Sequence, residues 1–174
     1  IGVITNIGES HIELLGSCQD IAEAKFELIE TLKDTGVSVL NGDCPYTFKM
    51  KHVVPGRSVI YGLNKPSEVK GSECKKLGKT GTQFTINYGL RSFPVHIPVP
   101  GTHNVYNALA AAATALSSGF DCNSIIEGLK TVELTGQRLD IIKTQLGFTV
   151  IDDTYNASPS SISAALDVLK DVQN

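Results

Sequence analysis

A chain of 174 residues, 41% of them hydrophobic, with a mean hydropathy of +0.03 and a net charge of −3, can form one domain, or one domain and part of another. The charge excludes a general basic surface for nucleic acid, and residues 108–116, the most apolar stretch, are too short to cross a bilayer. The four cysteines lack CxxC spacing and a nearby histidine pair, and no signal segment opens the chain, so we expect a reduced, cytoplasmic protein without zinc or disulfides.

The first forty residues predict a strand, a helix and a second strand. Val3-Ile4 is the first strand, residues 20–33 have helical apolar spacing, and residues 37–40 are the second strand. The sequence opens inside a probable strand without an initiating Met and closes after about three turns of helix. We therefore expect an internal fragment of a larger protein.

Between residues 53 and 99 the pattern changes to short runs broken by Gly, Pro and Asn. Residues 58–61, 83–86 and 93–97 predict strands, and the turn residues between them favour hairpins. We expect this middle third to be mainly antiparallel, beside a mostly parallel α/β sheet with flanking helices.

Two helices follow, over residues 104–117 and 124–130, and then a β-type stretch over residues 139–151 with a turn at 145–147. Residues 148–151 predict a buried strand at the end of this stretch. The best place for a linker is Thr135-Gly136, which divides the chain into residues 1–135 and 136–174.

Polar residues crowd the segment after that buried strand, from Asp152 to Ser161. Ser158 is a good N-cap and Pro159 fits the first position of the helix that follows. Two carboxylates, a phenol and an amide thus lie at the carboxyl end of a strand, which is where ligands of open α/β sheets bind. The alternative is a solvated strand-to-helix loop.

Lys25 lies on the apolar side of the first predicted helix. On a wheel of about 100° per residue it falls within the stripe formed by Ile21, Leu28, Ile29 and Leu32. An inward lysine has to lose its proton, pair, or be chemically altered. The alternative is a lysine whose ammonium group reaches water past the helix end.

Two asparagines, Asn104 and Asn107, share one face of the helix at 104–117 with several alanines. Amides at i and i+3 offer donors and acceptors to a planar ligand. The alternative is that Asn104 caps the helix while the alanines pack against another helix. At the proposed linker, the guanidinium of Arg138 suits phosphate, and an ion pair with Asp140 is the competing interpretation.

Four segments in this order resemble the Mur ligase family: residues 5–13 with Ala24-Lys25, residues 101–112, residues 136–138 and residues 152–159. The resemblance runs from residue 1 to about residue 169. It implies a central ATPase domain over residues 1–135 and the beginning of a Rossmann-like C-terminal domain over residues 136–174. It also implies a cytoplasmic enzyme of cell-wall synthesis, expected to be a monomer.

The last segment resembles the branch of the family that joins D-alanyl-D-alanine to UDP-MurNAc-tripeptide through an acyl phosphate, using ATP and Mg²⁺. By position, Lys25 resembles the family's carbamylated lysine, whose carbamate would hold Mg²⁺ together with His11. Asn104 and Asn107 would meet adenine, with Asn107 the better candidate. Arg138 would reach ribose or phosphate, and Asp153 the ribose hydroxyls.

The departure from the family pattern is that the sequence contains no GxxxxGK[ST] phosphate loop. We therefore expect this chain by itself to be inactive. The alternatives are another ligase of the same superfamily, such as a folylpolyglutamate synthetase-like or muramyl-peptide-recycling enzyme, and a non-catalytic nucleotide-binding module.

Overall fold

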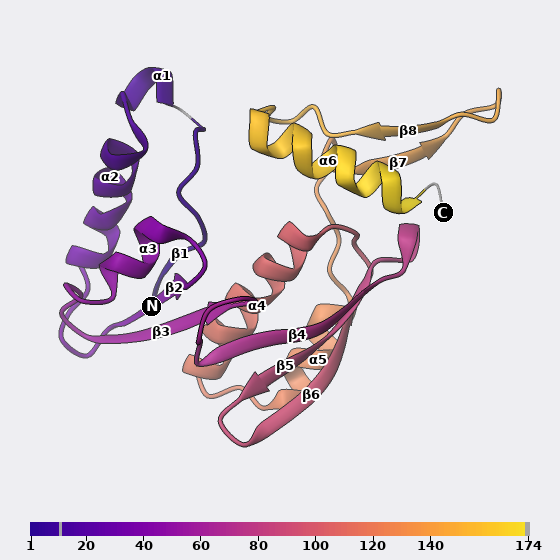
Figure 1. Ribbon diagram of the computed structural model, residues 1–174. Helices are drawn as coiled ribbons and strands as arrows, with labels where there is room; N and C mark the ends of the chain where they lie inside the picture. The colour runs from indigo at the N-terminus through magenta and orange to yellow at the C-terminus, as the bar shows by residue number, and fades with distance from the viewer. Residues whose placement is uncertain (11, 173–174) are drawn as a thin grey trace.

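The computed structural model describes residues 1–10 and 12–172, which form two sheets and their flanking helices (Figure 1). Six strands form a mixed sheet in sequence order: β1 (Gly2–Ile4), β2 (Val37–Asn41), β3 (Arg57–Gly62), β4 (Val69–Lys76), β5 (Thr82–Tyr88) and β6 (Arg91–Ile97). The second sheet is an antiparallel hairpin of β7 (Asp140–Lys143) and β8 (Thr149–Asp152). The predicted fold class, a mostly parallel α/β sheet with flanking helices and an antiparallel subsheet, is confirmed.

The helices alternate with the strands at the start of the chain and follow them later. They are α1 (Ile12–Leu15), α2 (Cys18–Glu30), α3 (Pro45–Met50), α4 (Thr102–Ser117), α5 (Cys122–Lys130), α6 (Pro159–Val172) and a short 3-10 turn, η1 (Gly78–Thr80). Helix α2 begins earlier than the apolar spacing predicts because Ser17 accepts a hydrogen bond from the Asp20 N–H and caps it. Within the described residues, no helix is both long and apolar enough to span a membrane.

The middle third differs from the expected antiparallel arrangement at its first strand. Strand β3 pairs in parallel with β2 and with β4, and only β4, β5 and β6 are antiparallel. Parallel neighbours usually need a long crossover, but residues 63–68 suffice here. Only two residue pairs join β3 to β4, Tyr61 with Val69 and Gly62 with Lys70, so β4 begins where β3 ends.

Two cores lie on opposite faces of the six-stranded sheet. Successive side chains of a strand point to opposite faces, so Val39 packs with α4 and α5 whereas Leu40 packs with α2 and α3. The larger core includes Val59, Tyr61 and Leu109, all at most 1% exposed. These two cores fix α4 on one side of β1 and β2 and fix α2 on the other.

The start of α6 agrees with the prediction from the sequence, whereas the burial of the hairpin does not. Ser158 caps α6 by accepting a hydrogen bond from the Ser161 N–H, and Pro159 is the first helical residue, as predicted. The strand predicted at residues 148–151 forms as β8, but the prediction that it is buried is wrong, because Phe148 is 65% and Val150 44% exposed. Helix α6 covers one side of this hairpin, and these two side chains remain open to solvent.

Candidate functional site

A cavity of about 450 Å³ opens where the carboxyl ends of β1 and β2 meet the start of α4. This size falls in the range of small-molecule sites. Parallel strands bring their carboxyl ends to one edge of a sheet, which is where α/β proteins bind ligands. The cavity is lined by Thr5, Asn6, Ile7, Asn41, Asp43, Cys44, Pro45, Tyr46, His103, Tyr106 and Asn107.

The loop after β1 is held in place through the carbonyl of Thr5. The Asn41 side-chain amide donates to this carbonyl at 3.0 Å, and the Tyr61 hydroxyl donates to it at 3.1 Å. The other end of the Asn41 amide accepts the Asp43 N–H at 2.9 Å. Three neighbouring strand ends are therefore tied together, and the backbone of Thr5 and Asn6 has one orientation toward the cavity.

Asp43 is the most heavily hydrogen-bonded side chain at the cavity. Its carboxylate accepts the N–H groups of Leu63, Asn64 and Lys65 at 2.7–2.9 Å and the hydroxyl of Tyr106 at 2.9 Å. Burial raises the pKa of Asp43, but the backbone donors and Tyr106 outweigh it and lower the pKa overall. Asp43 therefore joins the β3–β4 connection to α4 as a carboxylate.

Asp43 and Tyr106 were not among the residues singled out from the sequence. Their contact joins positions 63 residues apart, which no local pattern encodes. The sequence does contain one indication of Asp43. It follows β2 just as Asn6 follows β1, and polar residues after the carboxyl ends of parallel strands are candidates for ligand binding.

The two predicted adenine-binding asparagines occupy different environments. Asn104 is 5% exposed and donates to the Pro100 carbonyl at 2.8 Å, whereas Asn107 is exposed and lines the cavity. The Asn107 amide donates to the Asn104 side-chain oxygen at 3.2 Å. Asn104 is therefore the support and Asn107 the residue that can contact a ligand. The helix cap is Gly101 and not Asn104.

The alanines of α4 serve packing. The larger core buries Ala108, Ala112 and Ala113. This agrees with the alternative interpretation, in which the alanines of this helix pack against another element. Ala111 and Ala115 line a separate hollow that α5 closes. Their small size lets α4 approach α5 and the sheet closely, and they contribute nothing to the cavity at Asn107.

The side chain of Lys25 is not buried within the apolar stripe of α2. Lys25 and Leu28 are exposed, the latter by 48%, and the buried face of α2 is formed by Ile21, Ala22 and Ile29. The wheel places Lys25 between Ile21 and Ile29, which are buried, but the Lys25 side chain lies beside the loop after β1 and is exposed there. The Lys25 ammonium nevertheless turns back to the protein and donates to the Asn6 carbonyl at 2.9 Å, beside the cavity lining.

The proposed partner of Lys25, His11, lies outside the described residues. In the described part of the chain, no group of three or more His, Cys, Asp or Glu side chains is placed to hold a metal ion. A carbamate on Lys25 is chemically compatible with its exposed position: the ammonium would lose a proton and its bond to Asn6, and the neutral amine would add carbon dioxide with release of a second proton.

Arg138 and Asp153 meet around the start of the hairpin. The Arg138 guanidinium stacks on the Tyr155 ring at 4.3 Å from its centroid. The Asp153 carboxylate accepts the Leu139 N–H at 3.2 Å. The alternative ion pair of Arg138 with Asp140 does not form in the described structure, because Asp140 accepts the Gln137 N–H at 2.7 Å instead.

His103 links this hairpin to the cavity. It lines the cavity from the first turn of α4, and burial lowers the pKa of its imidazole. The negative charge of Asp153 acts in the opposite direction and raises the His103 pKa, so the two side chains are electrostatic neighbours. Asn107, His103 and the Asn6 backbone that Lys25 contacts therefore lie at the same cavity, and Asp153 is close enough to His103 to affect its pKa. Arg138 lines a different cleft beside Asp140.

Residues 1–115 match the Mur ligase middle domain. The chain belongs to the Mur ligase family. Over 171 residues, or 98% of its length, this Mur ligase chain is 39% identical to the UDP-N-acetylmuramoyl-tripeptide–D-alanyl-D-alanine ligase of Bacillus subtilis. It is 31% identical to the ligase of the same name from Escherichia coli. It spans 36% and 38% of the length of these two relatives.

Solved structures agree with the family assignment. A crystal structure of MurF from Acinetobacter baumannii superposes with a TM-score of 0.90 at 31% identity, over 99% of this Mur ligase chain and 37% of that protein. MurF from Thermotoga maritima, solved in complex with ADP, shares the fold with a TM-score of 0.83 at 21% identity, over 97% of this chain and 38% of that one.

Proposed function

We propose that this chain is part of an ATP-dependent ligase that joins D-alanyl-D-alanine to UDP-MurNAc-tripeptide. The observation that carries the proposal is the cavity at the carboxyl ends of β1 and β2, where Asn107 and His103 face the backbone that receives Lys25. Ligases of this name match 98% of the chain, whereas a diaminopimelate ligase of Chlamydia caviae matches 66%. The longer sequence match supports the D-alanyl-D-alanine branch.

In this proposal the cavity binds the adenine nucleotide. The Asn107 amide offers one donor and one acceptor to the edge of a purine, and its bond to buried Asn104 limits the rotation of the side chain. Holding the amide in one rotamer reduces the entropy lost on binding. Asp153 accepts from ribose hydroxyls. Arg138, which stacks on Tyr155 and lines a different cleft, would have to turn toward the nucleotide to supply a cation for ribose or phosphate.

The reaction has two steps. A carboxylate oxygen of the tripeptide attacks the γ-phosphorus of ATP and releases ADP, which gives an acyl phosphate. The amine of D-alanyl-D-alanine then attacks the acyl carbon, phosphate leaves and the amine loses a proton. Mg²⁺, held by carbamylated Lys25 and His11, would neutralise charge on the phosphate oxygens. The chain's described residues bind and orient the nucleotide.

We also propose that the two sheets belong to two different domains. Residues 1–135 carry the six-stranded sheet with α1 to α5 and are assigned to the central domain. Residues 136–174 contain the hairpin and α6 and are assigned to the start of the C-terminal domain. The support for this boundary is that residues 131–139 contain neither helix nor strand.

The test is a ligase assay on the complete protein that contains this chain. Phosphate release with ATP and UDP-MurNAc-tripeptide is expected with D-alanyl-D-alanine, and not with diaminopimelate or glutamate as the amine. Asn107→Ala should raise the KM for ATP about 10-fold or more, as expected for a lost hydrogen-bonded contact. Equal turnover with another amine would place the chain in a different branch of the family.

A further inference from the structure

The hairpin unit, defined here as residues 136–172, rests on the six-stranded sheet through α6. Val168 of α6 is 1% exposed, and one of its methyl groups lies 3.1 Å from where a Cβ on Gly101 would stand. The last turn of α6 also packs against η1, where the Asp171 carbonyl lies close to Gly78. These contacts join segments that are far apart in sequence.

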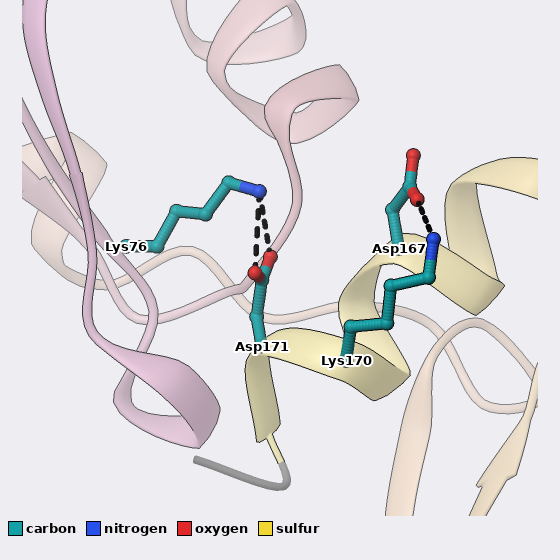
Figure 2. Close-up of polar contacts among 4 residues, drawn as sticks. All are labelled: Lys76, Asp167, Lys170 and Asp171. Atoms are coloured by element: carbon teal, nitrogen blue, oxygen red, sulfur yellow. Dashed lines mark hydrogen bonds and ion pairs between the residues drawn. The ribbon is translucent and has the colours of Figure 1, made fainter.

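One ion pair reinforces this contact. The Lys76 ammonium, at the end of β4, reaches both carboxylate oxygens of Asp171, at 2.9 and 3.2 Å (Figure 2). The Asp171 side chain is 23% exposed and that of Lys76 52%. A second acid of α6, Asp167, pairs with Lys170 of the same helix, and Figure 2 shows this pair beside the first. Among the ion pairs of the described residues, the Lys76–Asp171 pair crosses between the two units. The hydrogen bond from Lys170 lowers the pKa of Asp167, and the charge of Lys76 also lowers it at longer range.

The connection between the units does not fix their arrangement by itself. Residues 131–139 contain no helix or strand, and Gln137 and Leu139 adopt positive φ values of 61° and 49°. Val132 and Leu134 pack against the larger core, whereas the N–H groups of Gln137 and Leu139 donate to Asp140 and Asp153 of the hairpin unit, so these contacts hold each end of the connection to its own unit. The position of the hairpin unit is therefore decided by its contacts, of which Val168 and the Lys76–Asp171 pair are the most specific.

This docking has a consequence for the candidate site. Asp153 belongs to the hairpin unit, whereas His103 belongs to α4 and lines the cavity. We propose that Lys76 and Asp171 are positioning residues, an electrostatic latch that holds α6 on the six-stranded sheet and keeps Asp153 beside His103. The latch does not depend on nucleotide binding, so the failure of either proposal leaves the other standing.

The experiment measures how often the docked surface opens. Val168→Cys places a thiol in the interface, and its rate of labelling by iodoacetamide, read by peptide mass spectrometry on the whole chain, reports the open population. Cys44, at the N-cap of α3, is 6% exposed where it lines the candidate cavity, and it reports opening or unfolding of the six-stranded unit in the same sample. Asp171→Asn is compared with Asp167→Asn, a matched control on the same helix.

With Asp171→Asn, labelling at position 168 should be about two- to fivefold faster while Cys44 labelling stays unchanged, in keeping with a partly exposed ion pair. Asp167→Asn should leave Cys44 labelling unchanged and accelerate labelling at position 168 by less than Asp171→Asn does, since Asp167 pairs with Lys170 and is affected by Lys76 only at longer range. Exchanging the charges, with Lys76→Glu and Asp171→Lys together, should restore the rate to within about twofold. Raising NaCl to 0.5 M should accelerate labelling of the parent and not of Asp171→Asn.

Three results would overturn the latch: no change with Asp171→Asn, an equal rise at Cys44, or no recovery in the exchanged pair. The same comparison without Val168→Cys uses the nuclear Overhauser effect between a Val168 methyl and the Gly101 Hα protons. Its weakening with Asp171→Asn and recovery in the exchanged pair supports the latch, and its invariance contradicts it.

Discussion

The hydroxyl of Tyr106 on α4 donates to the carboxylate of Asp43 after β2 at 2.9 Å, and this bond connects the two walls of the candidate cavity. The same carboxylate accepts three consecutive N–H groups from the β3–β4 connection. One ionised side chain thus holds a strand end, a crossover and a helix in register. The geometry of Asn107, one residue after Tyr106, depends on it.

Asp43→Asn should therefore destabilise the chain by about 1–2 kcal/mol at pH 7, since an amide cannot accept as many of these donors. The native pKa of Asp43 is lowered, so its stabilising effect is complete above the unfolded pKa of about 3.9 and is lost as pH falls through the native pKa. Urea unfolding at pH 7 and pH 3 measures this. A difference between parent and variant that stayed constant with pH would contradict the role of the charge.

Asn104→Ala should mainly lower the stability of the fold, whereas Asn107→Ala should mainly weaken nucleotide binding. Asn104 is buried and bonded to the Pro100 carbonyl, so its loss should cost about 1–3 kcal/mol of unfolding free energy. Asn107 is exposed, so its substitution should change stability by less than about 0.5 kcal/mol. In the complete protein, Asn107→Ala should still weaken ATP binding in calorimetry. Equal loss of stability in both variants would argue against this division.

Lys25→Ala in the complete protein should abolish ligation while leaving the fold intact, because Lys25 is exposed and makes one hydrogen bond, to the Asn6 carbonyl. Small carboxylic acids should partly restore activity by supplying the missing oxygens. Lys25→Arg should not be rescued, since its guanidinium stays positive. A carbamate carbon signal with ¹³C-bicarbonate, absent in Lys25→Ala, is the readout besides activity. Normal ligation by Lys25→Ala would refute the role of the lysine.

The 174-residue chain alone should neither hydrolyse ATP nor bind it tightly. Its sequence lacks the glycine-rich loop whose N–H groups cradle a triphosphate, so the cavity offers contacts mainly to the nucleobase and ribose. Titration calorimetry with Mg-ATP should show no binding at micromolar concentration. Micromolar affinity would mean that the residues present hold the triphosphate without that loop.

The sequence by itself determined the local elements. Periodicity located β1, β2, β5, β6 and α4, and the Ser158-Pro159 pair located the start of α6, because these signals depend on residues within a few positions of one another. Periodicity did not indicate α3 or the parallel pairing of β3 with its neighbours. The four motifs in order carried the family resemblance, and residues 1–115 confirm it.

Only the tertiary structure decided which candidates face the cavity. The helical wheel could not tell that Lys25 is exposed although it falls between the buried Ile21 and Ile29, and the i, i+3 spacing could not tell that Asn104 is buried and Asn107 is exposed. The Asp43–Tyr106 and Lys76–Asp171 contacts join residues 63 and 95 positions apart. Such pairs depend on which faces the sheet and helices bury together, and this is fixed by packing of the whole chain rather than by any local pattern.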